Sequence, residues 1–377
     1  MKHICINMTM FSERITGTGY FIKRILKVLQ QIDNHNKYTL LFSSSVKEPQ
    51  EVFGIFAGNF KVKKVPLIKN KICRIAYEQF FMPLEIKNRF DVFYSPVPSV
   101  PIFLKLKGTK IISTIHDLTP FRIEGKYGFF QQKYVELITK KAPKVSESIV
   151  TVSENSKSDI CNELLVDNKK VHVIYNFTEK QSLPDSKKKR NNIFFFVGNI
   201  QPGKNIQRMI EAFEAFSLVK EKYELHLLGK IGWKSDGLIK RIESSPRANN
   251  IRLLGYVSDD VLDDYYKNSA ALLYPSLYEG FGIPPLEAIS LGCPIVISDL
   301  SSLPEVGGEA AIYVDPYSVE SIKSGMLQAI DKEVIAEKFM FYEKQIRKFD
   351  SKVQTQRLLA LFEQNSIDYY CEYESKS

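Results

Sequence analysis

The sequence predicts an α/β protein made of two doubly wound domains. The chain has 377 residues, of which 44% are hydrophobic, and is long enough to bury two full cores. Apolar runs that predict strands alternate with segments of helical periodicity, which is typical of parallel sheets covered by helices. A polar, proline-containing segment at 179–190 separates two such series. We therefore expect a first domain over 1–184, a linker at 185–191, a second domain over 192–344, and a C-terminal helix and tail over 345–377.

The composition favours a reducing compartment. The five cysteines include no C-x-x-C pair, which argues against a zinc site and against a disulfide framework. No window approaches the ~20 apolar residues that a membrane helix needs, and the N-terminus has too short an apolar core for a signal peptide. We expect a cytoplasmic protein, either soluble or peripheral on the inner face of the plasma membrane.

The charge is unevenly distributed along the chain. Residues 1–190 contain 32 Lys and Arg against 17 Asp and Glu, whereas residues 191–377 contain 20 against 26. This asymmetry indicates that the first domain meets an anionic partner. Because the sequence contains no recognised nucleic-acid-binding motif, we expect a membrane surface or a diphosphate-bearing acceptor rather than nucleic acid.

The first predicted strand, near His3–Asn7, leads into a loop that contains Gly17 and Gly19. A helix follows, and it is predicted by five apolar residues at helical spacing: Phe21, Ile22, Ile25, Leu26 and Leu29. A strand, a Gly-x-Gly turn and a helix start together bring backbone N–H groups to a phosphate. Gly17 and Gly19 are therefore candidates for binding the phosphate of a donor substrate. A plain turn explains the same glycines equally well.

A basic stretch from Lys61 to Arg74 contains six Lys and Arg and no acidic residue. The segment behind it, Ile75–Ile86, includes the large apolar residues Phe80, Phe81, Met82 and Leu84. Basic residues beside exposed apolar groups are typical of interfacial membrane contacts. The alternative is a solvated loop followed by a helix of the core, and the sequence leaves both open.

Polar side chains lie at the ends of two further predicted strands. The strand Asp91–Ser95 contains Tyr94 and ends in a proline-rich loop, and the strand Ile111–Ile115 is followed directly by His116 and Asp117. Residues just past the carboxyl ends of parallel strands line the ligand crevice of an open sheet. We interpret His116 as a catalytic candidate, and Tyr94 and Asp117 as acceptor-binding candidates, although an isolated histidine is more often structural.

The second domain is predicted to begin with a buried strand at Asn192–Val197, followed by a loop at 198–205 and a helix from Ile206. Asn199 and Lys204 lie in this loop, and Lys204 comes just before the helix. An ammonium group at that position can contact a phosphate. Both residues are therefore candidates for donor binding, although only the position of Lys204 distinguishes it from an ordinary solvated lysine.

Two more strands are predicted at Tyr223–Leu228 and 250–257, and the second of them ends at Tyr256 and Val257. The acidic residues that follow, at 259–260, are explained by helix capping and by the helix dipole. Because the chain contains no D-x-D motif and no cluster of His and Cys ligands, we predict no metal site.

The most informative stretch runs over residues 274–316. An apolar strand, Ala270–Tyr274, breaks into a loop that contains Glu-Gly-Phe-Gly at 279–282, and a helix opens at Pro284-Pro285. Glycines let backbone amides approach a ligand closely, and the helix start offers unpaired N–H donors. The alternative is an ordinary strand, loop and helix.

Two glutamates of this stretch, Glu279 and Glu287, are separated by seven residues. A carboxylate accepts hydrogen bonds and can hold two sugar hydroxyls at once, so each glutamate could hold one sugar ring. We add three backbone positions to the candidate donor site: Gly280, Phe281 and Gly282.

The segment EGFGIPPLE, with LGCPIVISDLSSLPEV downstream, resembles the signature of the retaining glycosyltransferases of family 4. The closest likeness is to bacterial mannosyltransferases of polysaccharide and O-antigen synthesis. The resemblance implies the GT-B fold, in which two facing Rossmann-like domains enclose a cleft. It also implies a last helix, at 345–362, that packs on the first domain.

The resemblance also implies roles for individual residues. It implies that the glycine loop of the first domain contacts the donor diphosphate, that His116 contacts the transferred sugar, and that the base lies near Tyr256 and Val257. The family usually has an arginine at the position of Asn199 or Gly203. One cationic contact to the diphosphate is therefore missing from this chain.

From these residues and this resemblance we expect a hexosyltransferase that acts with retention of anomeric configuration and without a metal or other cofactor. We expect Glu279, a catalytic candidate like His116, to hold the sugar, Glu287 the ribose and Lys204 the diphosphate. The favoured donor is GDP-mannose, and the acceptor is a glycan, lipid-linked by preference. The alternatives are a nucleotide-sugar epimerase or hydrolase of the same fold, and a non-catalytic nucleotide-sugar-binding protein.

Overall fold

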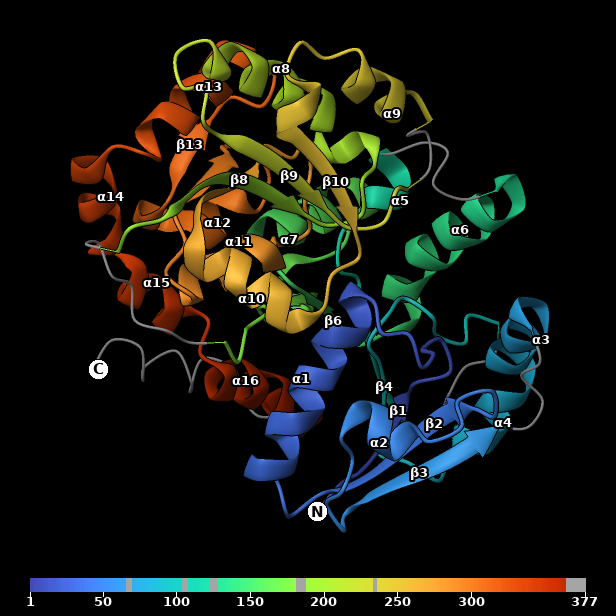
Figure 1. The fold of residues 1–377 in the computed structure, drawn as a ribbon. Helices are drawn as coiled ribbons and strands as arrows, with labels where there is room; N and C mark the ends of the chain where they lie inside the picture. The colour runs from blue at the N-terminus through green and yellow to red at the C-terminus, as the bar shows by residue number, and fades with distance from the viewer. Residues whose placement is uncertain (66–69, 104–107, 123–127, 181–187, 233–235, 364–377) are drawn as a thin grey trace. The chain divides into compact units, whose positions relative to one another are not determined.

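The structure is a computed structural model that describes residues 1–65, 70–103, 108–122, 128–180, 188–232 and 236–363. It divides the chain into two compact units (Figure 1). Unit 1 comprises Met1–Phe177 together with the chain from Asp350 onwards, and unit 2 comprises Thr178–Phe349. The expected linker at 185–191 follows shortly after this division, and its residues 185–187 lie outside the described part of the chain.

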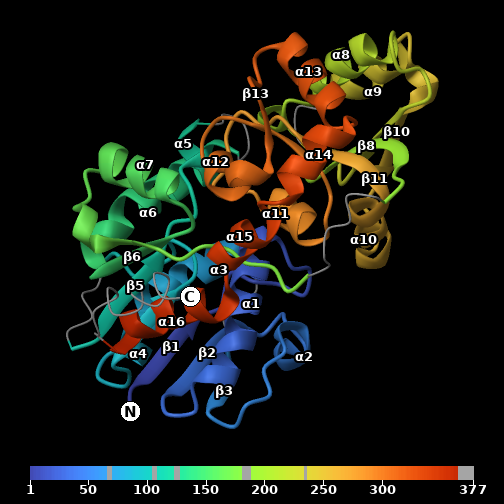
Figure 2. The same cartoon turned by 90° about the vertical axis from the view of Figure 1, so that its left-hand side faces the viewer.

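Unit 1 is built on a seven-stranded parallel sheet in the order β3-β2-β1-β4-β5-β6-β7 (Figure 2). The strands are β1 (His3–Asn7), β2 (Lys37–Ser43), β3 (Phe60–Val65), β4 (Val92–Ser95), β5 (Lys110–Thr114), β6 (Ser148–Thr151) and β7 (Val171–Val173). The chain winds outward from β1 to β3 and then continues from β4 on the other side of β1. The sheet therefore has its topological switch point between β1 and β4, where ligands bind in open α/β sheets.

Unit 1 contains helices and helical turns of different length, of which the first buries an apolar stripe. They are α1 (Gly17–Ile32), α2 (Pro49–Phe53), α3 (Lys71–Ala76), the π-helical turn η1 (Tyr77–Phe81), α4 (Met82–Ile86), α5 (Thr119–Arg122), α6 (Phe129–Val145), α7 (Glu154–Leu164), the 3-10 turn η2 (Asn168–Lys170) and α16 (Ser351–Glu363). The five apolar residues that predicted α1 are all buried, which confirms its periodicity. The α16 helix lies beside α1 (Figures 1 and 2), and the Lys110 ammonium on β5 donates to the Leu361 carbonyl at 2.8 Å.

Unit 2 is built on a six-stranded parallel sheet in the order β10-β9-β8-β11-β12-β13. The strands are β8 (Asn191–Val197), β9 (Glu224–Leu228), β10 (Ile251–Gly255), β11 (Ser269–Tyr274), β12 (Ile295–Ser298) and β13 (Ile312–Val314). Here the switch point lies between β8 and β11. Both strands are nearly continuous apolar runs, as expected for strands buried on both faces.

The helices of unit 2 cover both faces of this sheet. They are α8 (Ile206–Ser217), α9 (Asp236–Glu243), α10 (Asp259–Asn268), α11 (Ile283–Ser290), α12 (Leu303–Gly307), α13 (Val319–Gln328), α14 (Lys332–Phe339) and α15 (Tyr342–Lys348), with 3-10 turns η3 (Pro202–Lys204), η4 (Ala248–Asn250) and η5 (Gly308–Ala310). The two doubly wound sheets confirm the predicted α/β class.

The structure differs from the sequence-based expectation in three elements. Gly17 and Gly19 lie in the first turn of α1 and not in a loop before it. The first part of the basic stretch at 61–74 is an edge strand, β3, rather than a loop. The single helix expected at 345–362 is divided into α15 and α16, because the Asp350 side chain accepts from the backbone N–H groups of residues 352 and 353 and starts a new helix.

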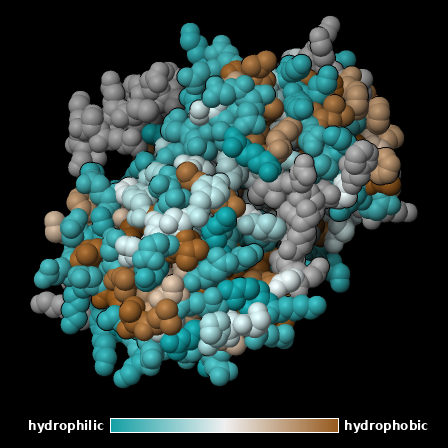
Figure 3. All heavy atoms as spheres, turned by 90° about the horizontal axis from the view of Figure 1, so that it is seen from above, coloured by the Kyte–Doolittle hydropathy of each residue, from teal (hydrophilic) through white to brown (hydrophobic). Residues whose placement is uncertain are grey.

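Within the described residues, no helix has both the length and the apolar character that crossing a membrane requires. Hydrophilic residues cover most of the face seen in Figure 3, where apolar side chains form small separate patches.

Candidate functional site

The loops that follow β8 and β11 are joined at the switch point of unit 2. The Leu277 N–H donates to the Gly203 carbonyl at 2.9 Å. The buried Asn205 side chain donates to the Pro275 carbonyl at 3.1 Å and to the Pro316 carbonyl at 2.6 Å. Asn205 adopts φ 60°, which an asparagine tolerates better than most side chains. These bonds hold together the loop that contains Lys204 and the loop that contains Glu279. From the sequence, these two residues are predicted independently of each other.

The structure brings Lys204 and Glu279 together in an ion pair, and both side chains are 12% exposed. The Lys204 ammonium also donates to the Tyr274 hydroxyl at 2.9 Å and lies 4.9 Å from the centre of the Tyr274 ring. Burial alone lowers the pKa of Lys204, but the Glu279 carboxylate and the Tyr274 oxygen outweigh burial and raise it above its usual value. Lys204 is therefore a fixed positive charge at the switch point.

Lys204 retains capacity for a ligand. An ammonium group has three N–H donors, and Glu279 and Tyr274 take two of them. The third can donate to an incoming oxygen without disrupting the pair. The cluster can thus hold an anion on one side and sugar hydroxyls on the Glu279 side.

The loop at 279–282 is held by two serines that follow β12. The Glu279 N–H donates to the Ser301 hydroxyl at 3.0 Å. The Ser302 hydroxyl lies 3.0 Å from the Glu279 carbonyl and 2.8 Å from the Phe281 carbonyl. Gly282 adopts φ 114°, and a Cβ there would lie 2.8 Å from a Leu303 methyl carbon. The loop therefore requires glycine at 282 for its conformation and for its packing.

Three glycines end the neighbouring strands β8, β9 and β10 and form a ledge without side chains. The Gly198 N–H bonds to the Leu228 carbonyl, and the Gly229 N–H bonds to the Gly255 carbonyl at 2.6 Å. A Cβ at Gly229 would lie 2.0 Å from the Gly198 oxygen, so no side chain fits between these loops. Gly229 is therefore required by the close packing of the loops that follow β8 and β9.

The remaining donor candidates of unit 2 occupy different environments. Asn199 is exposed in the loop after β8, and Tyr256 is exposed just beyond β10. Val257 is half-buried against the core of unit 2. Phe281 is buried and packs edge-on against Phe349, with ring centres 5.3 Å apart, so its side chain serves packing.

Glu287 lies in α11 and is almost fully buried. The Tyr266 hydroxyl donates to its Oε2 at 3.3 Å. Glu279 and Glu287 therefore differ in their partners: Glu279 bonds to a cation, whereas Glu287 has a neutral tyrosine among its partners. The ribose contact expected of Glu287 stays a prediction.

Unit 1 has a cavity of about 190 Å³ at its own switch point. Its lining comes from the loop after β1, the first turn of α1 and the loop after β4: Met10, Phe11, Ser12, Arg14, Ile15, Thr16, Thr18 and Val97. Gly19 packs behind this lining, where an added Cβ would lie 2.9 Å from an Ile15 methyl carbon. The close approach of α1 to the loop therefore explains Gly19, whereas nothing lies within 4 Å of a Cβ at Gly17.

His116 is held at the end of β5, next to the loop that lines this cavity. Its Nε2 lies 2.9 Å from the Pro96 carbonyl, and its ring packs edge-on against Phe21 of α1 at 5.0 Å. Because a carbonyl only accepts, Nε2 carries the proton and Nδ1 holds a lone pair in the neutral ring. Burial lowers the pKa of His116 below its ordinary 6.5, although Pro96 and Asp117 act in the opposite direction. The ring is neutral at pH 7 and can accept a hydrogen bond from a hydroxyl.

The state of His116 predicts a pH dependence of stability. Because the folded-state pKa is lowered, the unfolded chain binds more protons as the pH falls below 6.5, and the free energy of unfolding decreases with the pH. Urea titrations from neutral pH to about pH 5 should show this decrease, and His116→Asn should make it shallower. Burial also lowers the pKa of His3 and His172, so some slope should remain. An unchanged slope in His116→Asn would show that His116 titrates normally.

Tyr94 and Asp117, the two acceptor-binding candidates, both have structural roles here. The acceptor contact expected of Tyr94 is corrected. Tyr94 is fully buried, its hydroxyl bonds to Thr114 at 3.0 Å, and its ring packs 5.4 Å from Phe362 of α16. It is a core residue and offers no surface to an acceptor. The Asp117 carboxylate accepts from the Thr119 N–H at 2.8 Å at the start of α5.

Several site residues were not predicted from the sequence. From the sequence, Tyr274 is only the end of a predicted strand. A tyrosine in an apolar run predicts burial and does not predict a contact to a distant lysine. The serines at 301 and 302 belong to the family motif, but the sequence predicts no role for them. The sequence does indicate the glycine ledge, because three predicted strands are each followed by glycine or contain one near their end. Only the strand order shows that these three strand ends are neighbours.

Within the described residues, no group of three or more His, Cys, Asp or Glu side chains is placed to hold a metal ion.

Comparison with known protein families divides the chain in the same way as its structure. Residues 15–181 match the family model described as Glycosyltransferase Family 4, and residues 178–348 match the model described as Glycosyl transferases group 1. The two matches overlap at residues 178–181.

Curated relatives and solved structures add to this result. The chain is 30% identical over 236 residues to O-antigen chain mannosyltransferase B of Escherichia coli, over 59% of this chain and 62% of that protein. It is 32% identical to O-antigen chain mannosyltransferase RfbU of Salmonella typhimurium, over 56% of this chain and 59% of that protein. The chain thus spans less than two thirds of the length of these relatives. Sucrose-phosphate synthase of Thermosynechococcus elongatus shares its fold, with a TM-score of 0.73 at 12% identity over 97% of this chain and 99% of that one.

Proposed function

Because the chain belongs to glycosyltransferase family 4 and has the GT-B fold, we propose that it transfers a hexose from a nucleotide-sugar to a glycan acceptor. The observation that carries this proposal is the cluster of Lys204, Glu279 and Tyr274 at the switch point of unit 2. It combines a fixed cation with a carboxylate on loops that the protein holds rigidly, as donor diphosphate and donor sugar together require.

The roles of the donor-binding residues follow from these contacts. Departure of the nucleoside diphosphate develops negative charge on its oxygens, and the third N–H of Lys204 is available to stabilise that charge. Glu279, tied to Lys204, and the amides at 280–282 hold the sugar hydroxyls. Glu287 binds the ribose, and the glycine ledge between Gly198 and Gly255 admits the nucleotide to the edge of the sheet.

The acceptor is assigned to unit 1. The 190 Å³ cavity is large enough for part of a sugar and offers three hydroxyls, of Ser12, Thr16 and Thr18, with the Arg14 side chain. The neutral His116 lies next to the loop that lines it and accepts a hydroxyl proton through Nδ1. In this scheme the acceptor attacks on the side of the leaving group, and the anomeric configuration is retained.

We favour GDP-mannose as donor and a lipid-linked glycan of polysaccharide or O-antigen synthesis as acceptor, because the two relatives above are named as O-antigen mannosyltransferases. The test is a panel of GDP-, UDP- and dTDP-sugars in which nucleotide release is measured with and without acceptor. We expect release with GDP-mannose that depends on acceptor, and a product whose anomeric configuration matches the donor by NMR. Release without acceptor would indicate a hydrolase or an epimerase, and binding without release would indicate a non-catalytic binding protein.

Transfer is expected to continue in excess EDTA, because the scheme assigns charge stabilisation to Lys204 and backbone amides and the sequence has no D-x-D pair. The rate of nucleotide release should be equal with and without chelator. Loss of release in EDTA and recovery with Mg²⁺ or Mn²⁺ would overturn this assignment of roles.

A further inference from the structure

Five large apolar side chains are exposed in one part of unit 1. They belong to α3, η1 and α4, which follow one another without a break, and to the loop after β4: Ile72 (78% exposed), Leu84 (66%), Phe103 (62%), Phe80 (54%) and Phe81 (51%). Phe80 and Leu84 are four residues apart, and Phe81 and Leu84 three, so these three share one side of the helical segment. Phe80 and Phe103 stack with ring centres 6.0 Å apart. We call these five residues the apolar face.

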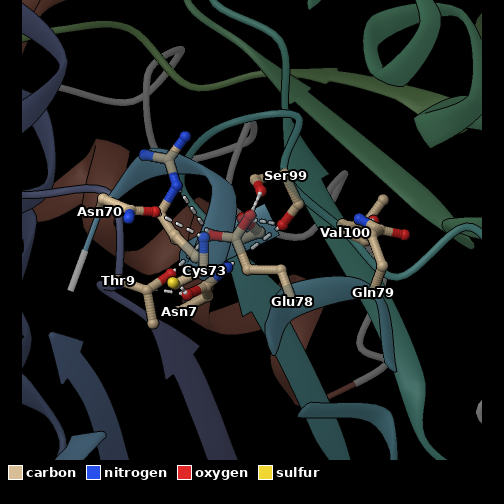
Figure 4. A network of polar contacts seen from close by, with 10 residues as sticks. Asn7, Thr9, Asn70, Cys73, Glu78, Gln79, Ser99 and Val100 are labelled. Carbon is tan, nitrogen blue, oxygen red and sulfur yellow. Dashed lines mark hydrogen bonds and ion pairs between the residues drawn. The ribbon is translucent and has the colours of Figure 1, made fainter. Parts of the chain in front are cut away.

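The other side of the same segment is fixed to the sheet and prevents the apolar face from turning inward. Glu78 is fully buried and accepts hydrogen bonds from the Thr9 hydroxyl at 2.7 Å and the Ser99 hydroxyl at 2.5 Å (Figure 4). Gln79 accepts from the Ile102 N–H at 2.9 Å and donates to the Val100 carbonyl at 3.0 Å. Because Glu78 and Gln79 use the buried side of the π-helical turn, Phe80 and Phe81 must point outward.

The surroundings of the apolar face are basic. Between residues 58 and 90 the chain has eight Lys and Arg and two glutamates. One of these is the buried Glu78, and the other, Glu85, forms an ion pair with Lys63 that joins α4 to β3. Lys61, Lys64, Lys71, Lys87 and Arg89 are exposed in the same region. Lysines on an edge strand also discourage edge pairing, but that role accounts only for β3 and not for the aromatic residues beside it.

We propose that the apolar face and the lysines around it dock on an anionic lipid surface. Half-exposed aromatic and aliphatic side chains at fixed positions can enter the boundary between headgroups and acyl chains, while lysines beside them meet the lipid charge. The positive sign fits anionic lipid and opposes a face-to-face contact between two copies of unit 1, because their basic residues would repel each other. This docking is independent of the chemistry at the switch points.

The test is co-sedimentation of the full chain with vesicles of phosphatidylcholine that contain phosphatidylglycerol, and with vesicles of phosphatidylcholine alone. The wild-type chain should bind the anionic vesicles preferentially, and added salt should release it. The variant Ile72→Ser/Phe81→Ser/Leu84→Ser should lower the partition coefficient roughly tenfold or more. The variant Lys71→Gln/Lys87→Gln should lower it about fivefold for each lysine.

The matched control removes similar exposed apolar groups from unit 2. Leu218 and Met340 are each 75% exposed, and Leu218→Ser/Met340→Ser should bind vesicles as the wild type does. Circular dichroism should show all variants folded, and turnover with a water-soluble acceptor should be unchanged in the triple variant. Equal vesicle binding by the triple variant and the wild type would overturn the proposal. So would a wild-type chain that ignores vesicles but forms a dimer that the triple variant does not form.

Discussion

Replacing Lys204 by methionine is expected to lower the transfer rate on the order of 10²- to 10³-fold, the usual effect of removing one group that stabilises charge in a transition state. It should also weaken binding of the free nucleoside diphosphate. Loss of one charged hydrogen bond costs about 1.5–3 kcal/mol, or on the order of 10- to 150-fold in affinity. Calorimetry with nucleoside diphosphate and nucleotide-release assays measure the two effects.

Two variants separate the loss of function from a loss of folding. Lys204→Met leaves the Glu279 carboxylate nearly buried without its cation, and breaking a buried pair costs about 3–5 kcal/mol of stability. In Lys204→Met/Glu279→Gln neither charge remains, so the midpoint of unfolding should recover while transfer stays low. Lys220→Met, an exposed lysine beyond the other end of α8, is the control and should be neutral. Wild-type affinity for nucleoside diphosphate in Lys204→Met would remove Lys204 from the donor site.

Glu279→Ala and Glu287→Ala are expected to affect different quantities, the transfer rate in the first variant and nucleoside diphosphate affinity in the second. Glu279→Ala should leave nucleoside diphosphate affinity close to that of the wild type, because Glu279 is assigned to the sugar, which the free nucleotide lacks. It should nevertheless lower transfer on the order of 10²-fold, because orientation of the sugar matters most in the transition state. Glu287→Ala should weaken binding of the nucleoside diphosphate itself by on the order of 10- to 150-fold.

Glu287 is buried, so its variant needs a measurement that a structural defect would not imitate. Affinities of wild type and Glu287→Gln are compared for a nucleoside diphosphate and its 2′-deoxy analogue. If Glu287 holds a ribose hydroxyl, removal of the hydroxyl should weaken wild-type binding and leave the variant almost unaffected. Equal losses in both proteins would place Glu287 outside the ribose site. Loss of nucleotide affinity in Glu279→Ala as large as in Glu287→Ala would contradict the separate roles.

The prediction from sequence was strongest where the chemistry lies within a few neighbouring residues. The strand, the glycine loop and the helix around Glu279 are local features, since φ above zero at Gly282 and the prolines of α11 restrict the backbone directly. The prediction of Tyr94 was wrong because a residue near the end of a strand can point toward either face of the sheet. Its burial depends on α16, which joins unit 1 from the far end of the chain.

The sequence by itself determined the α/β class, the family, and the positions of Lys204 and Glu279 after buried strands, because period, turn residues and motif spacing are all local. Only the tertiary structure decided that Lys204, Glu279 and Tyr274 form one cluster, and that Phe80 and Phe81 face outward while Glu78 and Gln79 are buried. The physical reason is that an ion pair between residues 75 positions apart depends on strand order. The direction of a side chain on a short helix likewise depends on which polar partners the sheet presents to its other side.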